Sequence, residues 1–290
     1  MSKYMAPAKI NLVLEVLGRR DDGYHEIRSL TQTVSLYDVL TFEPAEEISF
    51  ECIEPRLQNA ENLVVKAAEL LRQVTGYYKG VSIKLEKRIP WGTGLGGGSS
   101  DAAATLLALN ELWEVRLEIS KLLPLAAKLG SDVPFFIYGG AALTEGKGER
   151  VTPLPPVSGW LVLLVPPLPK MPSKTERLYS LLDTRHYTRG FFVDKAVEAL
   201  SRLGQVNPSL LYNVFDNVAF DAFPGLEGWW SQFEEAGARY IHLAGSGLTM
   251  FAPVENRAQA EELCGRLRQQ GLEAYAVSTC WIKYQNQRVK

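Results

Sequence analysis

A glycine-rich stretch, Trp91 to Leu106 (WGTGLGGGSSDAAATL), holds the clearest candidate chemistry in this 290-residue chain. Five of the seven residues 92–98 are glycine, and an alanine- and leucine-rich segment with helical spacing follows directly. Glycine is costly to order, so this density indicates backbone that bends sharply or approaches a ligand closely. The following helix would offer unpaired N–H groups and the positive end of its dipole. Together these features predict an anion site, most simply for phosphate.

Three other interpretations of the loop fit less well. A Walker loop, G-x-x-x-x-G-K-[ST], fits the spacing and the final Ser99, but Gly98 stands where its lysine must be. The dinucleotide pattern G-x-G-x-x-G is matched by Gly92, Gly94 and Gly97, yet the acidic residue expected about 20 residues later would still fall within the helix. A flexible linker would join domains, whereas this stretch joins a strand to a helix. Because the dinucleotide pattern is matched in its glycines, a nicotinamide-dependent oxidoreductase stays open as the alternative from another enzyme class.

Five motifs in order resemble the GHMP kinases, the superfamily of galactokinase, homoserine kinase and mevalonate kinase. They are APAKINL at 6–12, DGYH at 22–25, the loop at 90–100 with its P-x-x-x-G-L-G-x-x-S-S pattern, GSDVP at 130–134 and GSG at 245–247. The full set is similar to the branch of this family that phosphorylates a cytidine-diphosphate-linked polyol for isoprenoid precursor biosynthesis. The resemblance implies an α+β, two-domain GHMP kinase fold with the active site in the cleft between the domains.

The same resemblance implies an ATP-dependent kinase whose glycine loop holds the phosphates through backbone amides. The residues expected to bind ATP are Pro90, Trp91, Gly92, Thr93, Gly94, Leu95, Gly96, Gly97, Gly98, Ser99 and Ser100. ATP transfer normally uses Mg²⁺, which takes few protein ligands. The metal ligands stay unknown: Ser99 or Ser100 is a candidate, but the glutamate used by related kinases has no evident counterpart.

Lys9 and Asp132 are the candidate catalytic pair. An isolated strand lysine is more often solvated, and Asp132 before Val-Pro could serve only as a helix N-cap. The resemblance implies that Asp132 is the general base for the substrate hydroxyl and that Lys9 is its electrostatic partner. An adjacent ammonium favours the ionised form of a carboxylate. A protein that only binds ATP is disfavoured because both residues are present.

Tyr24, His25 and Asn11 are the candidate substrate contacts. A lone Tyr-His pair after a polar turn would more often be ordinary packing. The resemblance implies that an aromatic ring stacks on the cytosine, that the histidine bonds its polar edge, and that Asn11 adds a further contact. Homoserine and mevalonate kinases, the alternative GHMP activities, act on substrates without a base to stack.

Two segments of the second half carry weaker signals. Gly245 to Gly247 could be a plain hairpin turn, but the resemblance implies a turn that brings the second domain to the phosphates or the substrate. Within residues 166–175 the family's short V-S-T-type segment is replaced by MPSKT. The role of Ser173 or Thr175 therefore stays open.

Periodicity and turn residues predict a mixed order of strands and helices. The expected strands are 10–16, 30–42, 81–85, one after 140, 160–165, 240–243, 249–252 and 273–279. The expected helices are 62–75, 102–113 with Ser99 to Asp101 as cap and first turn, 120–129, a short one after 131, 174–182, 193–203, 228–236 and 258–270. The proline-rich stretch 153–156 is the expected domain boundary, giving an N-terminal domain 1–153 and a C-terminal domain 154–290.

Composition narrows the partners. Hydrophobic residues make up 46% of the chain, which is typical of a globular protein. The net charge is −2, so no overall electrostatic field attracts nucleic acid or an anionic membrane. A small basic excess, Lys283, Arg288 and Lys290, indicates a solvated tail. The three cysteines and three histidines are scattered, which indicates reduced thiols in a cytoplasmic protein without a zinc site. No signal peptide or membrane span is expected, and the oligomeric state stays open.

Overall fold

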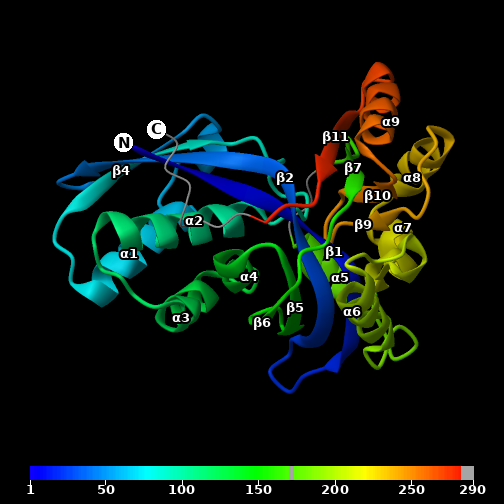
Figure 1. Ribbon diagram of the computed structural model, residues 1–290, viewed down its shortest axis with the longest axis horizontal. Helices are drawn as coiled ribbons and strands as arrows, with labels where there is room; N and C mark the ends of the chain where they lie inside the picture. Colours follow the sequence, from blue (N-terminus) through cyan, green and yellow to red (C-terminus); the bar gives the residue numbers. More distant parts are fainter. Residues whose placement is uncertain (170–172, 282–290) are drawn as a thin grey trace.

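Two sheets organise the protein in the computed structural model, which describes residues 1–169 and 173–281 (Figure 1). The first sheet contains β1 (Ser2–Arg19), β2 (His25–Ala45), β3 (Ile48–Cys52), β4 (Gly80–Glu86), β5 (Ala141–Gly146), β6 (Arg150–Leu154) and β8 (Tyr212–Asn213). The second contains β7 (Trp160–Val165), β9 (His242–Leu243), β10 (Met250–Val254) and β11 (Glu273–Ser278). Helices and sheets are mixed, so the α+β prediction is confirmed. The basic tail residues predicted to be solvated lie outside the described residues.

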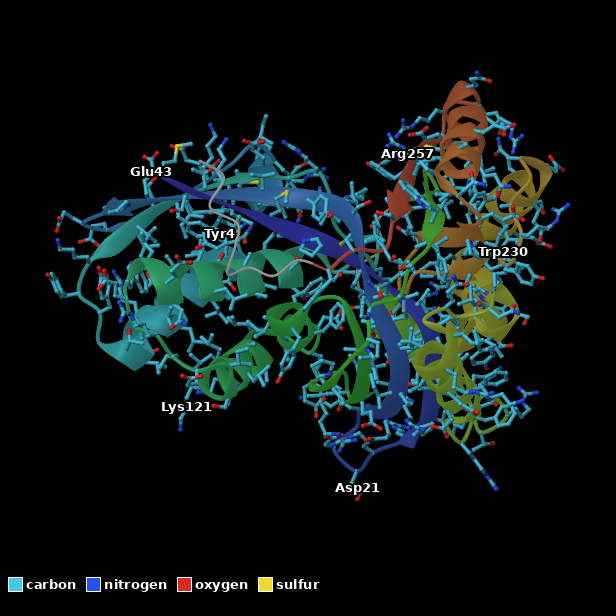
Figure 2. All side chains as sticks on the ribbon, viewed as in Figure 1. Tyr4, Asp21, Glu43, Lys121, Trp230 and Arg257 are labelled. Atoms are coloured by element: carbon cyan, nitrogen blue, oxygen red, sulfur yellow. The ribbon has the colours of Figure 1, made fainter. Side chains whose placement is uncertain are left out.

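The long antiparallel pair β1 and β2 forms the centre of the first sheet. Its register shifts between Pro7 and Ala8, between Asn11 and Val13, and between Val16 and Gly18. Along the path β3-β4-β2-β1-β8, these two strands are central, and β5 pairs with β2 as well. Asp21 lies in the turn that joins them and points away from the body of the protein (Figure 2). This pair therefore holds the APAKINL motif within β1 and the DGYH motif at the turn that leads into β2.

The first half of the chain contains the helices α1 (Leu63–Thr75), α2 (Gly97–Leu112), α3 (Ile119–Leu129) and α4 (Val133–Tyr138). They lie together beside the first sheet (Figure 1). Buried alanines 102–104 let α2 lie close to the neighbouring elements, and one hydrophobic cluster joins α2 to the sheet and to α1.

The later helices are α5 (Lys174–Leu181), α6 (Phe191–Leu203), α7 (Ala219–Ala222), α8 (Leu226–Glu235) and α9 (Arg257–Gln269), and most of them gather around the second sheet (Figure 1). The two halves share cores: Leu14 and Val16 of β1 belong to the cluster of the second half. Strand β8 also pairs in parallel with β1. The division between residues 153 and 154 stays a prediction. It falls at the end of β6, and residues 155–159 join that strand to β7.

The start of α2 differs from the prediction. The helix begins at Gly97, five residues before the expected Ala102, after Gly96 in the left-handed region at φ 72°, and no side chain caps it. Ser99 and Ser100 therefore lie inside the first turns, and the prediction that they cap the helix is wrong. Glycines at 97 and 98 can adopt helical angles, so the glycine run ends inside the helix and leaves its first N–H groups without an intrahelical acceptor.

Three strands among the described residues were not expected, and one of them is β8, which pairs in parallel with β1. β3 is short and pairs in parallel with β4, and β6 contains Pro153 at the margin of the sheet, where a missing N–H is tolerated. Within the described residues, no helix is long and apolar enough to cross a membrane.

Candidate active site

A cavity of about 960 Å³ opens between residues of the two halves. Its lining includes the predicted residues Lys9, Asn11, Tyr24, His25, Ser99 and Asp132. From the second half come Ser173, Thr175, Glu176, Tyr179, Tyr187 and Ser246, among others. All five sequence motifs thus contribute residues around one space. The cleft position implied by the resemblance fits this arrangement.

Lys9 and Asn11 reach the cavity because they share one face of β1. Residues two apart on a strand point the same way, so Ala8, Ile10 and Leu12 pack instead into a hydrophobic cluster that spans both halves. The Lys9 ammonium donates a 2.7 Å hydrogen bond to Oδ1 of Asn11. The strand therefore gives the lysine a fixed direction.

Asn11 is itself held by two hydroxyl groups of β2. Its Nδ2 atom lies 2.6 Å from Oγ of Ser29 and 3.1 Å from Oγ1 of Thr31, and it donates to both. These contacts leave Oδ1 of Asn11 turned toward Lys9. Asn11 is 6% exposed and lines the cavity, so its amide orients the lysine, while its contact with a substrate stays a prediction.

Asp132 stands at the N-cap position of α4 but makes no capping hydrogen bond. Its Oδ2 atom lies 3.6 Å from the Lys9 ammonium, and its side chain is 47% exposed. The lysine side chain is 8% exposed, so the pair joins a buried cation to a carboxylate that opens into the cavity. The capping interpretation is wrong, and the carboxylate is available to a substrate hydroxyl.

The glycine loop lies against Lys9 and against the turn at residues 245–247. The Lys9 amide donates to the Leu95 carbonyl at 2.9 Å, and the Thr249 amide donates to the Thr93 carbonyl at 3.1 Å. A Cβ atom on Gly94 would lie 2.7 Å from Cα of Gly247, and one on Gly96 would lie 2.9 Å from Cγ of Lys9. Protein packing therefore explains part of the glycine content.

Gly98 and Ser99 differ from the glycines before them. A Cβ atom on Gly98 would meet only Leu63 at 3.9 Å, so this exposed backbone has room for a ligand. Ser99 lines the cavity, whereas the side chain of Ser100 is fully buried and the amide of Ser100 bonds the Gly96 carbonyl. The remaining loop residues, 90–98, are not among the residues that line the cavity.

The turn at Gly245 to Gly247 is held in place from both sides. Asn213 donates to the carbonyl oxygens of Leu243 at 2.9 Å and Gly245 at 3.1 Å. The Asn11 backbone amide donates to the Ala244 carbonyl at 2.9 Å. This turn thus lies against both the glycine loop and β1.

Two hydroxyl groups meet beside that turn. Oγ1 of Thr175 and Oγ of Ser246 lie 3.0 Å apart, and both residues line the cavity together with Ser173. Both candidates from the altered segment therefore reach the cavity, while Met171 and Pro172 of that segment lie outside the described residues.

Aromatic rings also line the cavity. The His25 ring stacks on Tyr179 with centroids 4.6 Å apart and an interplanar angle of 19°. The Tyr187 hydroxyl lies 3.5 Å from Nε2 of His25. Burial, followed by the charge of Arg19, lowers the pKa of His25. The imidazole is therefore neutral at pH 7.

Tyr24 projects beside this group with 55% of its surface exposed. The Lys147 ammonium lies 4.6 Å from the centre of its ring. Tyr179, Tyr187 and Lys147 were not expected at the site. The sequence shows them as ordinary helix and loop residues, and no motif marks them.

No group of three or more His, Cys, Asp or Glu residues suited to a metal occurs in the described part of the chain.

Comparisons with known proteins agree on one family. Residues 62–140 match the family described as the GHMP kinases N terminal domain. A 4-diphosphocytidyl-2-C-methyl-D-erythritol kinase of Dehalococcoides mccartyi is 46% identical over 280 residues, which are 96% of this chain and 98% of that protein. The enzyme of the same name from Symbiobacterium thermophilum is 42% identical over 94% of this chain and 97% of its own length.

Solved structures agree as well. A crystal structure of 4-(cytidine 5'-diphospho)-2C-methyl-D-erythritol kinase superposes with a TM-score of 0.82 at 38% identity, covering 96% of this chain and 98% of the other. A homoserine kinase from Cytophaga hutchinsonii has a TM-score of 0.73 at 19% identity, covering 97% of this chain and 94% of its own. The second likeness concerns the fold alone.

Proposed function

The chain belongs to the 4-diphosphocytidyl-2-C-methyl-D-erythritol kinases of the GHMP superfamily, and we propose that it transfers the γ-phosphate of ATP to the 2-hydroxyl of that cytidyl polyol. The product would enter the non-mevalonate route to isoprenoid precursors. The observation that carries the proposal is a single cavity that holds the Lys9 and Asp132 pair together with the aromatic group of Tyr24 and His25. A homoserine kinase, a mevalonate kinase or a nicotinamide-dependent oxidoreductase would have no use for this combination.

Asp132 acts as the general base in this proposal. Its Oδ2 atom would accept the proton of the 2-hydroxyl as that oxygen forms a bond to the γ-phosphorus, and the bond from that phosphorus to the bridging oxygen of ADP would break. Phosphoryl transfer asks a protein mainly for positioning and charge stabilisation. The Lys9 ammonium, directed by Asn11, would stabilise negative charge on the transferred group.

The glycine loop and the start of α2 are proposed to hold the phosphates of ATP. Their support is the uncapped helix start after Gly96 and the open backbone at Gly98. The contacts predicted for residues 90–100 are proposed as backbone contacts, with Ser99 as the hydroxyl that reaches the cavity. Mg²⁺ would neutralise charge on the phosphates when bound, and it needs few protein ligands. Ser99 is suited to this role because its side chain lines the cavity.

The cytidine end of the substrate is proposed to bind at the aromatic group. The exposed ring of Tyr24 can stack on the cytosine, and His25, backed by Tyr179, can bond its polar edge. Lys147 and Arg19 line the same cavity and can attract the diphosphate of the substrate. Free Cys52, Cys264 and Cys280 support a cytoplasmic setting.

A direct assay tests the function. The pure protein with ATP, Mg²⁺ and the cytidyl polyol should yield ADP and a monophosphorylated product in equal amounts. Homoserine and mevalonate serve as parallel substrates under the same conditions. Product from either of them, and none from the cytidyl polyol, would reject the substrate assignment and keep the family.

We expect the KM for the cytidyl substrate to rise about severalfold as the pH falls from 7 toward 5. Because the pKa of His25 is lowered, its ring is neutral at pH 7 and gains a proton only under acidic conditions. The added charge would face Arg19 and remove the acceptor nitrogen of the imidazole. Steady-state kinetics across this range measure the effect.

The control is His25→Gln, which keeps hydrogen-bonding groups but does not titrate. Its KM should be higher at pH 7 and should not change with acidification. An equal acidic rise in both proteins would show that another group is responsible.

A further inference from the structure

Three buried charges lie directly behind the glycine loop and have no part in the mechanism above. The ammonium of Lys87 contacts Oδ2 of Asp38 at 2.5 Å and Oδ2 of Asp101 at 2.7 Å. The side chains of Lys87, Asp38 and Asp101 are 6%, 0% and 3% exposed. Charged residues are rarely this buried, and burying them is costly unless they are paired. The cost of burying these three charged groups indicates that the cluster has a specific role.

The cluster connects the two ends of the glycine loop. Lys87 follows β4 and precedes the loop, whereas Asp101 lies in α2 just after it. Oδ1 of Asp38, from β2, accepts the amides of Arg88 at 2.6 Å and Ile89 at 2.8 Å. The N-terminal end of the loop is thus fixed to β2 of the first sheet. The Lys87 ammonium joins this end to α2, which begins at the C-terminal end of the loop.

The Lys87 ammonium also lies close under the first turn of α2. A Cβ atom on Gly97 would approach its Nζ atom to 2.8 Å and Cγ2 of Ile89 to 3.1 Å. Gly97 is therefore needed so that the helix can start this close to the lysine. A shift of Lys87 would move the backbone whose amides face the phosphate site.

The electrostatics make the three groups dependent on one another. Burial lowers the pKa of Lys87, but the charges of Asp101 and Asp38 outweigh it and raise the pKa overall. Burial raises the pKa of Asp101, and the Lys87 charge opposes that rise. Removing the lysine alone would leave two buried carboxyl groups without a cation, which is costly.

We propose that Lys87, through its ion pairs with Asp38 and Asp101, is a positioning residue that sets the spacing of the two ends of the ATP loop. The inference rests on the proposed function, since it takes the loop to be the ATP site. Lys87 would not touch ATP. It would hold the loop amides where the phosphates need them, and misplacement of such groups by about 1 Å can cost up to roughly a hundredfold.

The test uses two variants of the full chain, Lys87→Met and the double variant Lys87→Met with Asp101→Asn. The single variant should lower the melting temperature, because it leaves unpaired buried carboxyl groups. The double variant should recover part of that stability, since Asp38 keeps its two backbone donors. Both should raise the KM for ATP about tenfold or more, with the KM for the cytidyl substrate within about twofold of the original protein.

Glu15→Ala is the matched control for stability, because it removes a buried hydrogen-bond acceptor and leaves a cavity. Glu15 is 0% exposed and accepts the Val193 amide at 2.8 Å, so its loss disturbs a buried carboxylate away from the loop. It should lower the melting temperature without changing the KM for ATP. Lys87→Arg, which keeps the charge, should recover part of the affinity for ATP.

The outcomes separate the two proposals. If the double variant is as stable as the original protein or the control and its KM for ATP is unchanged, Lys87 has only a structural role and the inference is wrong. If the original protein binds no ATP in calorimetry and makes no ADP, the proposed function itself fails. A selective rise in the KM for ATP, restored in part by arginine, supports the positioning role.

Discussion

Asp132→Asn is expected to lower kcat by roughly 10²- to 10⁴-fold, the usual contribution of a general base. The amide keeps the shape of the side chain but cannot take the proton of the 2-hydroxyl. Since the Asp132 side chain makes no capping bond and is 47% exposed, its replacement should not unfold α4. ADP formation measures kcat, and calorimetry should show ATP affinity within about twofold of the original protein, because the proposed ATP contacts lie on the loop and α2.

Glu176→Gln is the control for this prediction. Glu176 also lines the cavity, from α5 in the second half of the chain, and is an exposed carboxylate that could be considered as a base. Its substitution should leave kcat within about threefold. A large loss in Glu176→Gln together with a small one in Asp132→Asn would reverse the assignment.

Lys9→Met is expected to lower kcat by about 10²- to 10³-fold, comparable to the loss of one preorganised donor at a transition state. Methionine retains most of the length of the buried stem, so packing against the loop at Gly96 is largely kept. What is lost is the cation 3.6 Å from Asp132. Steady-state kinetics with both substrates measure the loss, which should fall mainly on kcat.

The double variant of Lys9→Met and Asp132→Asn gives a sharper result. Residues that act as a unit have strongly non-additive effects, so the double variant should lose little more activity than the worse single one. Fully multiplicative losses would indicate that the two residues act independently and that their closeness has no part in catalysis. Melting temperatures of all three variants control for unfolding.

The sequence predicted local features well where one physical rule dominated. The alternation around Lys9 and Asn11 placed them on one strand face, and the structure has them there. The first helix was expected over 62–75 and runs over Leu63–Thr75, where the side chain of Asn62 caps its start and Gly76 ends it at φ 69°. These outcomes depend on neighbours within a few residues, so the local pattern contained the information.

The prediction failed where packing overruled local preference. Ser99 to Asp101 are good capping types, yet α2 begins earlier because Gly97 can fit over Lys87 and Ile89. Strand β6 was not expected around Pro153, yet the chain there pairs with β5 as an outer strand. In both cases a contact between neighbouring elements decides, and the propensities of the residues themselves do not show that contact.

The sequence by itself determined which chemical groups this protein has and their order along the chain: a lysine, an aromatic pair, a glycine-rich loop and a carboxylate. Tertiary structure alone decided that Lys9 and Asp132 meet at 3.6 Å and that Tyr179 stacks behind His25. It also decided that one buried ammonium joins both ends of the loop. The reason is that side-chain types and periodicities are local properties, whereas distances between remote residues follow from how the hydrophobic clusters pack the sheets and helices together.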